Sequence, residues 1–120
     1  MSLSDVHGQL STAVVLYTIA LGVWGIFNFI RRQGISESYW GALVIGELLI
    51  MAQGLLGGAL WTQGLRPARG VHVLYGVVTA LGIPAVYVCT RGREGQAENL
   101  AYGSAALIVA LLTFQAIVTA

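Results

Sequence analysis

The sequence predicts an all-α integral membrane protein, a bundle of four helices in up-down-up-down order. Two observations support this fold class. Apolar residues make up 57% of the chain and charged residues only 9%, whereas about a quarter of the residues in a soluble domain are charged. The apolar residues also fall into four runs of roughly 20 residues, the length that crosses a hydrocarbon core about 30 Å thick. We therefore expect one transmembrane domain over residues 1–120.

Polar connectors of about ten residues separate the four predicted helices, so consecutive helices must be antiparallel neighbours. Ser36 or Ser38 can cap the second helix. Pro84 lies inside the third run, where its ring removes a backbone hydrogen bond and predicts a kink. No removable signal peptide is expected, because the first residues lack a basic region and a small-residue cleavage site. The predicted helices cover about residues 10–30, 39–61, 71–89 and 100–118.

The arginines predict the orientation in the membrane. All six basic residues are arginine. Excess arginine marks the cytoplasmic side of a membrane protein, so both termini are predicted to lie outside, in a membrane of the bacterial inner-membrane type. The inner connectors carry Arg31, Arg32, Arg91 and Arg93, and the outer connector carries Arg66 and Arg69.

Net charge and cysteine content exclude several partners and sites. The net charge is +1 and Cys89 is the only cysteine. Nucleic acid, which requires a basic face, is therefore not expected as a partner. Neither an intrachain disulfide nor a cysteine-based metal site is possible. The expected partners are membrane lipid and either other membrane subunits or a second copy of the chain.

The chain also has the pattern of a repeated helical hairpin. The first and third helices both open with Val-His, at His7 and His72. When the second and fourth helices are aligned, Trp40 meets Tyr102. Each half of the chain would then be one hairpin that begins with a histidine.

The two histidines are the candidate site. The first and third helices run in the same direction, so His7 and His72 are predicted to lie on one side of the membrane at similar depth. Two histidines that face each other across a bundle can supply both axial ligands of a haem iron. In the competing interpretation, both side chains simply face water or lipid headgroups.

Neighbouring residues favour a haem, most simply haem b. Gly8 and Gly76, close to the two histidines, would leave room for a flat macrocycle. Arg66 and Arg69 are predicted to lie on the same side of the membrane, where they could pair with haem propionates. A chlorin is an alternative ligand, since one histidine suffices to bind magnesium.

Three other features indicate contacts between helices. An ionised carboxylate inside a membrane costs about 2.5 kcal/mol or more, so Glu47 should face protein or water. We favour a hydrogen bond from Glu47 to a neighbouring helix or subunit over a role in proton transfer. Gly54 and Gly58 form a close-packing pattern, and Gln53 is expected to bond across helices.

Around the second connector the chain resembles the haem A synthase family of membrane proteins. Members have a glutamine followed by a leucine-glycine pair, then an outer loop with a proline, and a histidine that opens the next helix. In this sequence these residues are Gln53, Leu56-Gly57, Pro67 and His72, and the resemblance extends over about residues 6–78. The family consists of two four-helix halves, each with a histidine pair on the outer side, which implies a haem held by His7 and His72.

The sequence departs from the family pattern at the position that matters for catalysis. In the catalytic half of the family, a glutamate precedes the first histidine within one helical turn and an arginine follows it. Here Asp5 and Val6 precede His7, and Gly8 follows it. The paired cysteines of the outer loops are also missing. The resemblance therefore implies haem binding without the family's oxidation chemistry.

Three functions compete at this stage. The leading hypothesis is a small cytochrome b-like subunit that binds a tetrapyrrole near the outer face and supports electron transfer in a respiratory or photosynthetic complex, with no catalytic activity of its own. The second is a cofactor-free accessory subunit that packs against a larger complex. The third is a haem-modifying enzyme assembled from two chains, which the missing acidic residue disfavours.

Overall fold

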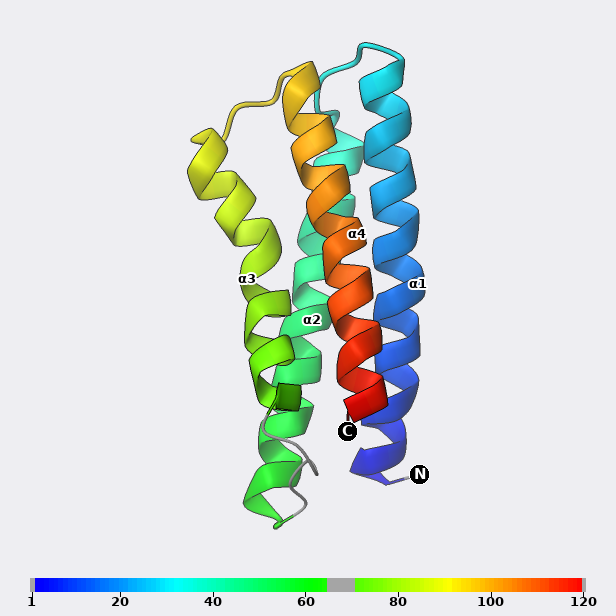
Figure 1. The fold of residues 1–120 in the computed structure, drawn as a ribbon, viewed down its shortest axis with the longest axis vertical. Coiled ribbons are helices and arrows are strands. Elements are labelled where there is room, and N and C mark those ends of the chain that lie inside the picture. Colours follow the sequence, from blue (N-terminus) through cyan, green and yellow to red (C-terminus); the bar gives the residue numbers. More distant parts are fainter. Residues whose placement is uncertain (1, 65–70, 120) are drawn as a thin grey trace.

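The computed structural model describes residues 2–64 and 71–119, and these residues form four α-helices. Figure 1 shows the helices side by side, with the N- and C-termini at the same end of the bundle. The predicted all-α, up-down-up-down four-helix bundle is confirmed. The helices are α1 (Leu3–Ile30), α2 (Glu37–Thr62), α3 (Val71–Thr90) and α4 (Gln96–Thr119).

All four helices are long and apolar enough to cross a membrane. The molecule is 48 Å long, close to the roughly 40–45 Å of a bilayer with its headgroup regions. Large apolar side chains cover its outer surface, among them Leu55, which is 76% exposed, and Val88, which is 72% exposed. Such a surface suits contact with lipid chains and not with water, as expected of an integral membrane protein.

Helix α1 begins about seven residues earlier than predicted because the chain has a capping box at its start. The Ser2 hydroxyl accepts a hydrogen bond from the Asp5 backbone N–H at 3.2 Å, and the Asp5 carboxylate accepts one from the Ser2 N–H at 3.4 Å. These bonds satisfy backbone donors that a helix start leaves open. His7 therefore lies inside the helix. At the start of α2, the cap is Ser36, whose hydroxyl accepts from the Tyr39 N–H at 3.1 Å.

Helices α1 and α4 make the closest contact in the bundle, and glycine makes it possible. A side-chain carbon added at Gly103 of α4 would lie 3.0 Å from the Gly22 carbonyl oxygen and 3.0 Å from the Ile26 backbone nitrogen of α1. One added at Gly25 would lie 2.9 Å from the Asn99 carbonyl oxygen. The two backbones thus touch directly, as small residues allow in membrane bundles.

The end of the bundle opposite the termini, which we term the closed end, is tied together by hydrogen bonds between its two connectors. The Ile35 N–H donates to the Glu94 carbonyl at 2.8 Å. The buried Asn99 side-chain amide donates to the Gln33 carbonyl at 2.7 Å. Close by, the fully buried Tyr39 donates its hydroxyl to the Leu21 carbonyl at 2.8 Å.

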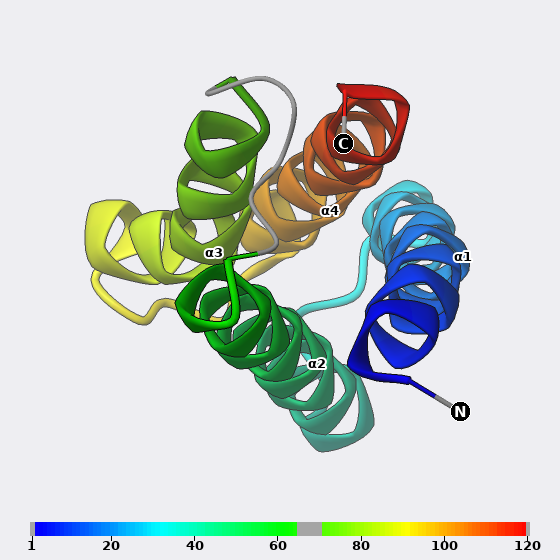
Figure 2. The same cartoon turned by 90° about the horizontal axis from the view of Figure 1, so that it is seen from below.

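Helices α2 and α3 form the loosest of the four neighbouring pairs. Figures 1 and 2 show the C-terminal half of α3 leaning away from the other helices. Pro84 lies inside this helix, where it cannot donate a backbone hydrogen bond to the preceding turn. Between the two helices the rings of Trp40 and Tyr87 are in contact, with centres 5.6 Å apart. The loose pairing widens the bundle on the α2–α3 side.

Candidate functional site

A cavity of about 750 Å³ lies in the half of the bundle that carries the termini, which we term the histidine end. All four helices contribute to its walls, with His7 from α1, Gly57 from α2, His72 from α3 and Ala116 from α4. Its volume falls in the range of about 300–1,000 Å³ that is usual for small-molecule and cofactor sites. Most of the lining is apolar, with a few polar groups, which is also typical of such sites.

The two predicted histidines meet in this cavity. Their ring centres are 6.3 Å apart and their ring planes are inclined by 63°. Helices α1 and α3 are diagonal partners, and Figure 2 shows them at opposite corners of the bundle, seen along its length. The imidazoles of His7 and His72 therefore approach each other across the interior, at the same end of the bundle, as the sequence predicted.

His72 is held by a backbone carbonyl of α4. Its Nδ1 atom lies 2.6 Å from the Ala116 carbonyl oxygen. A carbonyl oxygen can only accept a hydrogen bond, so Nδ1 carries the proton of the neutral ring. The lone pair of the ring is then on Nε2, where it is free to bind a metal. Metal-ligating histidines usually donate their other ring N–H to a carbonyl or carboxylate oxygen in this way.

His7 is fixed through its backbone. The Gln53 side-chain amide donates to the His7 carbonyl oxygen at 2.8 Å and also to the Ser11 hydroxyl. Ser11 in turn donates to the same carbonyl at 2.9 Å. The predicted bond of Gln53 across helices is thus present and links α2 to the first turns of α1. The Nδ1 atom of the His7 ring is buried and has no hydrogen-bond partner among the described residues.

The glycines beside the histidines occupy different positions. Gly76 lines the cavity, and a carbon added there would meet nothing within 4 Å. Gly8 is exposed on α1 and is not part of the cavity wall. Gly57 of α2 lies across from His7, since a carbon added there would lie 3.4 Å from the His7 ring. Arg66 and Arg69 lie outside the described residues.

The expected close packing at Gly54 and Gly58 is not present within the described chain. A carbon added at either residue would meet nothing within 4 Å, and both residues line the cavity. The intimate helix contact lies instead between Gly22 and Gly25 of α1 and Gly103 of α4. Gly54 and Gly58 of α2 thus have open space beside them, whereas the glycines of α1 and α4 let two helix backbones touch.

Sequence reasoning missed three hydroxyl residues of the cavity, Ser11, Thr79 and Thr113, and two of them follow a histidine on the same helix. Ser11 lies one turn after His7, and Thr79 lies two turns after His72. Their spacings of four and seven residues from a histidine put each on the histidine's own helix face. That spacing was the available signal, but short hydroxyl side chains are frequent in membrane helices and do not stand out.

The spacing of the two histidine rings can be compared with that of two imidazoles bound to one metal atom. Imidazole–metal bonds are about 2 Å long and the ring centre lies roughly 1.1 Å behind the nitrogen, so two imidazoles in line on one metal atom have centres about 6 Å apart. The observed 6.3 Å matches this value. No group of three or more histidine, cysteine, aspartate or glutamate side chains that could hold a bare ion occurs in the described ranges. Two ligands suffice for haem iron, because the macrocycle supplies the other four.

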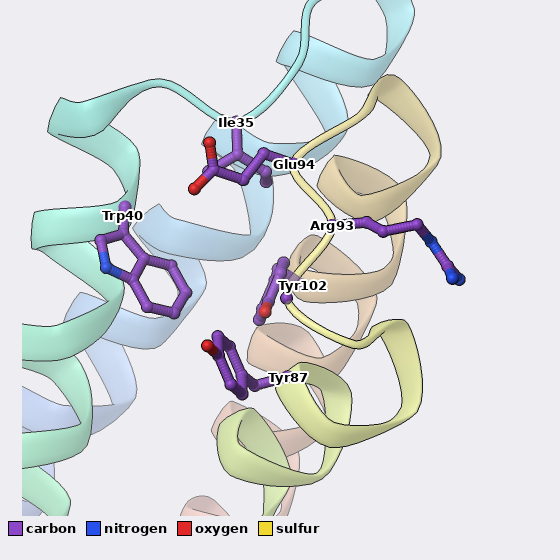
Figure 3. A pocket seen from close by; sticks show the side chains of 7 residues that line it. Ile35, Trp40, Tyr87, Arg93, Glu94 and Tyr102 are labelled. Atoms are coloured by element: carbon purple, nitrogen blue, oxygen red, sulfur yellow. The ribbon is translucent and has the colours of Figure 1, made fainter.

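A second, smaller cavity of about 150 Å³ lies at the closed end. Figure 3 shows its wall, where Trp40, Tyr87 and Tyr102 come together from three helices. Trp40 and Tyr102, which the repeat aligns, contact each other with ring centres 6.1 Å apart. Arg93 points away from the aromatic rings in Figure 3 and pairs with Glu98 at 3.4 Å. Among the described residues, the wall of this smaller cavity contains no histidine, unlike that of the larger cavity.

Glu47 lies half-buried in α2. One of its carboxyl oxygens is buried and has no hydrogen-bond partner within residues 2–64 and 71–119. A hydrogen bond from Glu47 to another helix of the same chain is therefore absent from the described part. Contact with a further subunit stays a prediction.

Neither a family model, nor a curated protein, nor a solved structure matches this chain.

Proposed function

We propose that this chain is a small membrane cytochrome that binds haem b between His7 and His72 and supports electron transfer within a respiratory or photosynthetic complex. The observation that carries the proposal is the distance of 6.3 Å between the two imidazole centres inside a cavity of about 750 Å³. The resemblance to one half of the haem A synthase family supports the same ligand pair.

The chain's own residues would prepare the site in three ways. The Ala116 carbonyl fixes the proton of His72 on Nδ1 and leaves Nε2 as the ligating atom. Gln53 and Ser11 hold the His7 backbone against α2. The apolar walls exclude water and so influence the reduction potential. When bound, the haem iron supplies one-electron chemistry by alternating between its ferric and ferrous states.

The proposed orientation has both termini outside, in a membrane of the bacterial inner-membrane type. It rests on four arginines at the closed end against two in the connector between α2 and α3. The pairing of Arg66 and Arg69 with haem propionates stays a prediction from the sequence. A chlorin with one histidine on magnesium is the alternative ligand for the same cavity.

A second candidate function is a cofactor-free accessory subunit. The loose α2–α3 side favours this candidate, because a neighbouring subunit could cover it. An enzyme built from two chains has less support, since Asp5 and Val6 stand where the related catalytic half has its glutamate.

An absorption spectrum of the protein purified in mild detergent separates these functions. Haem bound by two histidines is six-coordinate and low-spin, with a Soret band and sharp α and β bands on reduction. His7→Ala and His72→Ala should each lose the haem or leave it high-spin, and added imidazole should restore the low-spin spectrum of His72→Gly. Tyr87→Ala at the closed end is the control and should keep the spectrum.

Two results would refute the haem proposal. One is a protein without visible absorption after gentle extraction and after incubation with haem. The other is a spectrum that is the same with and without both histidines. In either case the accessory-subunit function becomes the better account.

A further inference from the structure

Thr79 is a buried polar residue whose hydroxyl makes no hydrogen bond to the described residues. It lies on α3, its side chain is 5% exposed, and it lines the large cavity. Its hydroxyl oxygen is buried and has no hydrogen-bond partner in the part of the chain that the structure describes. A hydroxyl left in this state is unfavourable, because it has lost water without gaining another partner.

The other buried helical threonines behave differently. Thr18 donates to the Val14 carbonyl at 2.7 Å, and Thr113 donates to the Val109 carbonyl at 2.8 Å. Each bond runs to the residue four positions earlier, which is the usual partner of a threonine inside a helix. Thr79 also lies inside a helix, on α3, but its hydroxyl makes no such hydrogen bond within the described residues. Its hydroxyl therefore has no competing hydrogen bond among the described residues, and the residue lines the cavity.

The position of Thr79 defines which part of a ligand it can reach. Seven residues separate His72 from Thr79, which corresponds to two turns or about 10 Å along the helix on the same face. The cavity extends over this length, since both residues line it. His72 lies near the end of the bundle that carries the termini, and Thr79 lies deeper inside. Thr79 thus lines the inner part of the cavity, deeper in the bundle than the histidines.

We propose that the Thr79 hydroxyl donates a hydrogen bond to an oxygen-bearing substituent on the inner edge of the bound tetrapyrrole, so that the site prefers a macrocycle with a carbonyl group at that edge. This inference rests on the proposed function, because it takes His7 and His72 as the metal ligands. It adds the chemical class of the ligand. A macrocycle with only hydrocarbon substituents at this edge would leave the hydroxyl without a partner.

The test compares two probes on the haem-free full-length protein in detergent. One is iron protoporphyrin IX, which has two vinyl groups on the edge opposite its carboxylates. The other is its diacetyl analogue, in which acetyl groups replace the vinyl groups. Thr79→Val removes the hydroxyl and keeps the shape of the side chain. It should weaken binding of the diacetyl probe about tenfold, the usual size of one hydrogen bond, and change binding of protoporphyrin less than about twofold.

Two further variants serve as controls. Thr113→Val removes a hydroxyl from the same cavity, but that hydroxyl is already bonded to Val109, so the ratio of the two affinities should not change. Thr79→Ser keeps a hydroxyl and should keep the preference. The acetyl carbonyl stretching frequency, measured by resonance Raman spectroscopy, should be lower in the wild type than in Thr79→Val.

The possible failures are distinguishable. If both probes bind with low-spin, histidine-ligated spectra but Thr79→Val changes neither the affinity ratio nor the stretching frequency, only the role of Thr79 is overturned. If Thr79→Val weakens the binding of both probes equally, Thr79 contributes only packing, and the proposed preference for a carbonyl-bearing macrocycle is overturned. If neither probe gives a histidine-ligated spectrum, the proposed haem site and this inference fall together.

Discussion

The two ends of the bundle use glycine for opposite purposes. At the closed end, Gly25 and Gly103 bring the backbones of α1 and α4 into contact, so that no space is left for a side chain. At the histidine end, Gly57 and Gly76 leave space open beside the two imidazoles. A glycine pattern in a membrane helix therefore does not by itself predict whether the space beside it is taken by a neighbouring backbone or left open as a cavity.

The difference comes from what surrounds the glycines. The closed end has two connectors that bond to each other, and the buried Asn99 and Tyr39 donate side-chain hydrogen bonds to backbone carbonyls. At the histidine end, Gln53 and His72 bond to backbone carbonyls of neighbouring helices around the large cavity. The first end maintains the fold, and the second is available for a ligand.

The largest effect is expected at Gly25. Gly25→Val would push carbon atoms against the Tyr39 hydroxyl and the Asn99 carbonyl. Overpacking of this kind typically costs about 1–3 kcal/mol. Two of the atoms in the way, the Asn99 carbonyl oxygen and the Gly103 Cα, are backbone atoms of α4 that cannot move alone, which puts this variant at the upper end or beyond. Gly54→Ala at the histidine end is the control and should change stability by less than about 1 kcal/mol. Unfolding in detergent measures the stability of both variants. An equal loss of stability in the two variants would contradict the contrast between the two ends.

The next effect is expected at Asn99. Asn99→Leu removes the bond to the Gln33 carbonyl and leaves that group without its donor. Removing one partner of a buried hydrogen bond costs about 1–3 kcal/mol. The midpoint temperature of thermal unfolding should therefore fall, while the haem content of the folded fraction should stay the same. A loss of haem without a loss of stability would mean that the two ends are coupled.

Gly57→Leu at the histidine end should lower haem affinity without a matching loss of folding stability. The new side chain would enter the space beside the His7 ring, where a first carbon already lies 3.4 Å from the ring. Haem affinity should fall at least about tenfold, which is about 1.4 kcal/mol, because the side chain occupies the ligand's volume. The stability of the haem-free protein should change little, as the cavity has room. Titration with haem and unfolding of the haem-free form measure the two quantities.

The smallest effect is expected at Arg93. Arg93→Gln breaks the ion pair with Glu98, in which the arginine side chain is 63% exposed. Exposed pairs contribute about 0–1 kcal/mol, and salt screens them further. Stability should therefore change by less than about 0.5 kcal/mol, and less again at high salt. A loss as large as that of Asn99→Leu would show that the closed end depends on charge and not on buried hydrogen bonds.

The fold class could be predicted because composition and run length determine it. Four apolar runs with short polar connectors leave few alternatives to an antiparallel bundle. The start of α1 was predicted too late, at about residue 10, because apolar character was used as its boundary. The Ser2–Asp5 capping box extends the helix into a polar stretch.

The site could be predicted only in part. The pairing of His7 and His72 follows from topology, since parallel helices bring equivalent positions to one level. The cavity wall does not follow, because helices that are apolar all round carry no stripe to show which face points inward. Gly8 and Gly76 were equivalent by sequence, yet only Gly76 lines the cavity. Thr79 could not be recognised, because its distinguishing feature is a hydrogen bond that it does not make.

The α1–α4 contact joins the first and fourth helices, and this affects the order of assembly. Gln96–Thr119 leaves the ribosome after His7, Gln53 and His72, which all precede it in the sequence. A nascent chain that ends before α4 already has both imidazoles and the glutamine, but lacks the closest partner of α1 and the carbonyl that lies against His72. Insertion of α4 therefore brings the α1 contact and the His72 hydrogen bond into place in a single step.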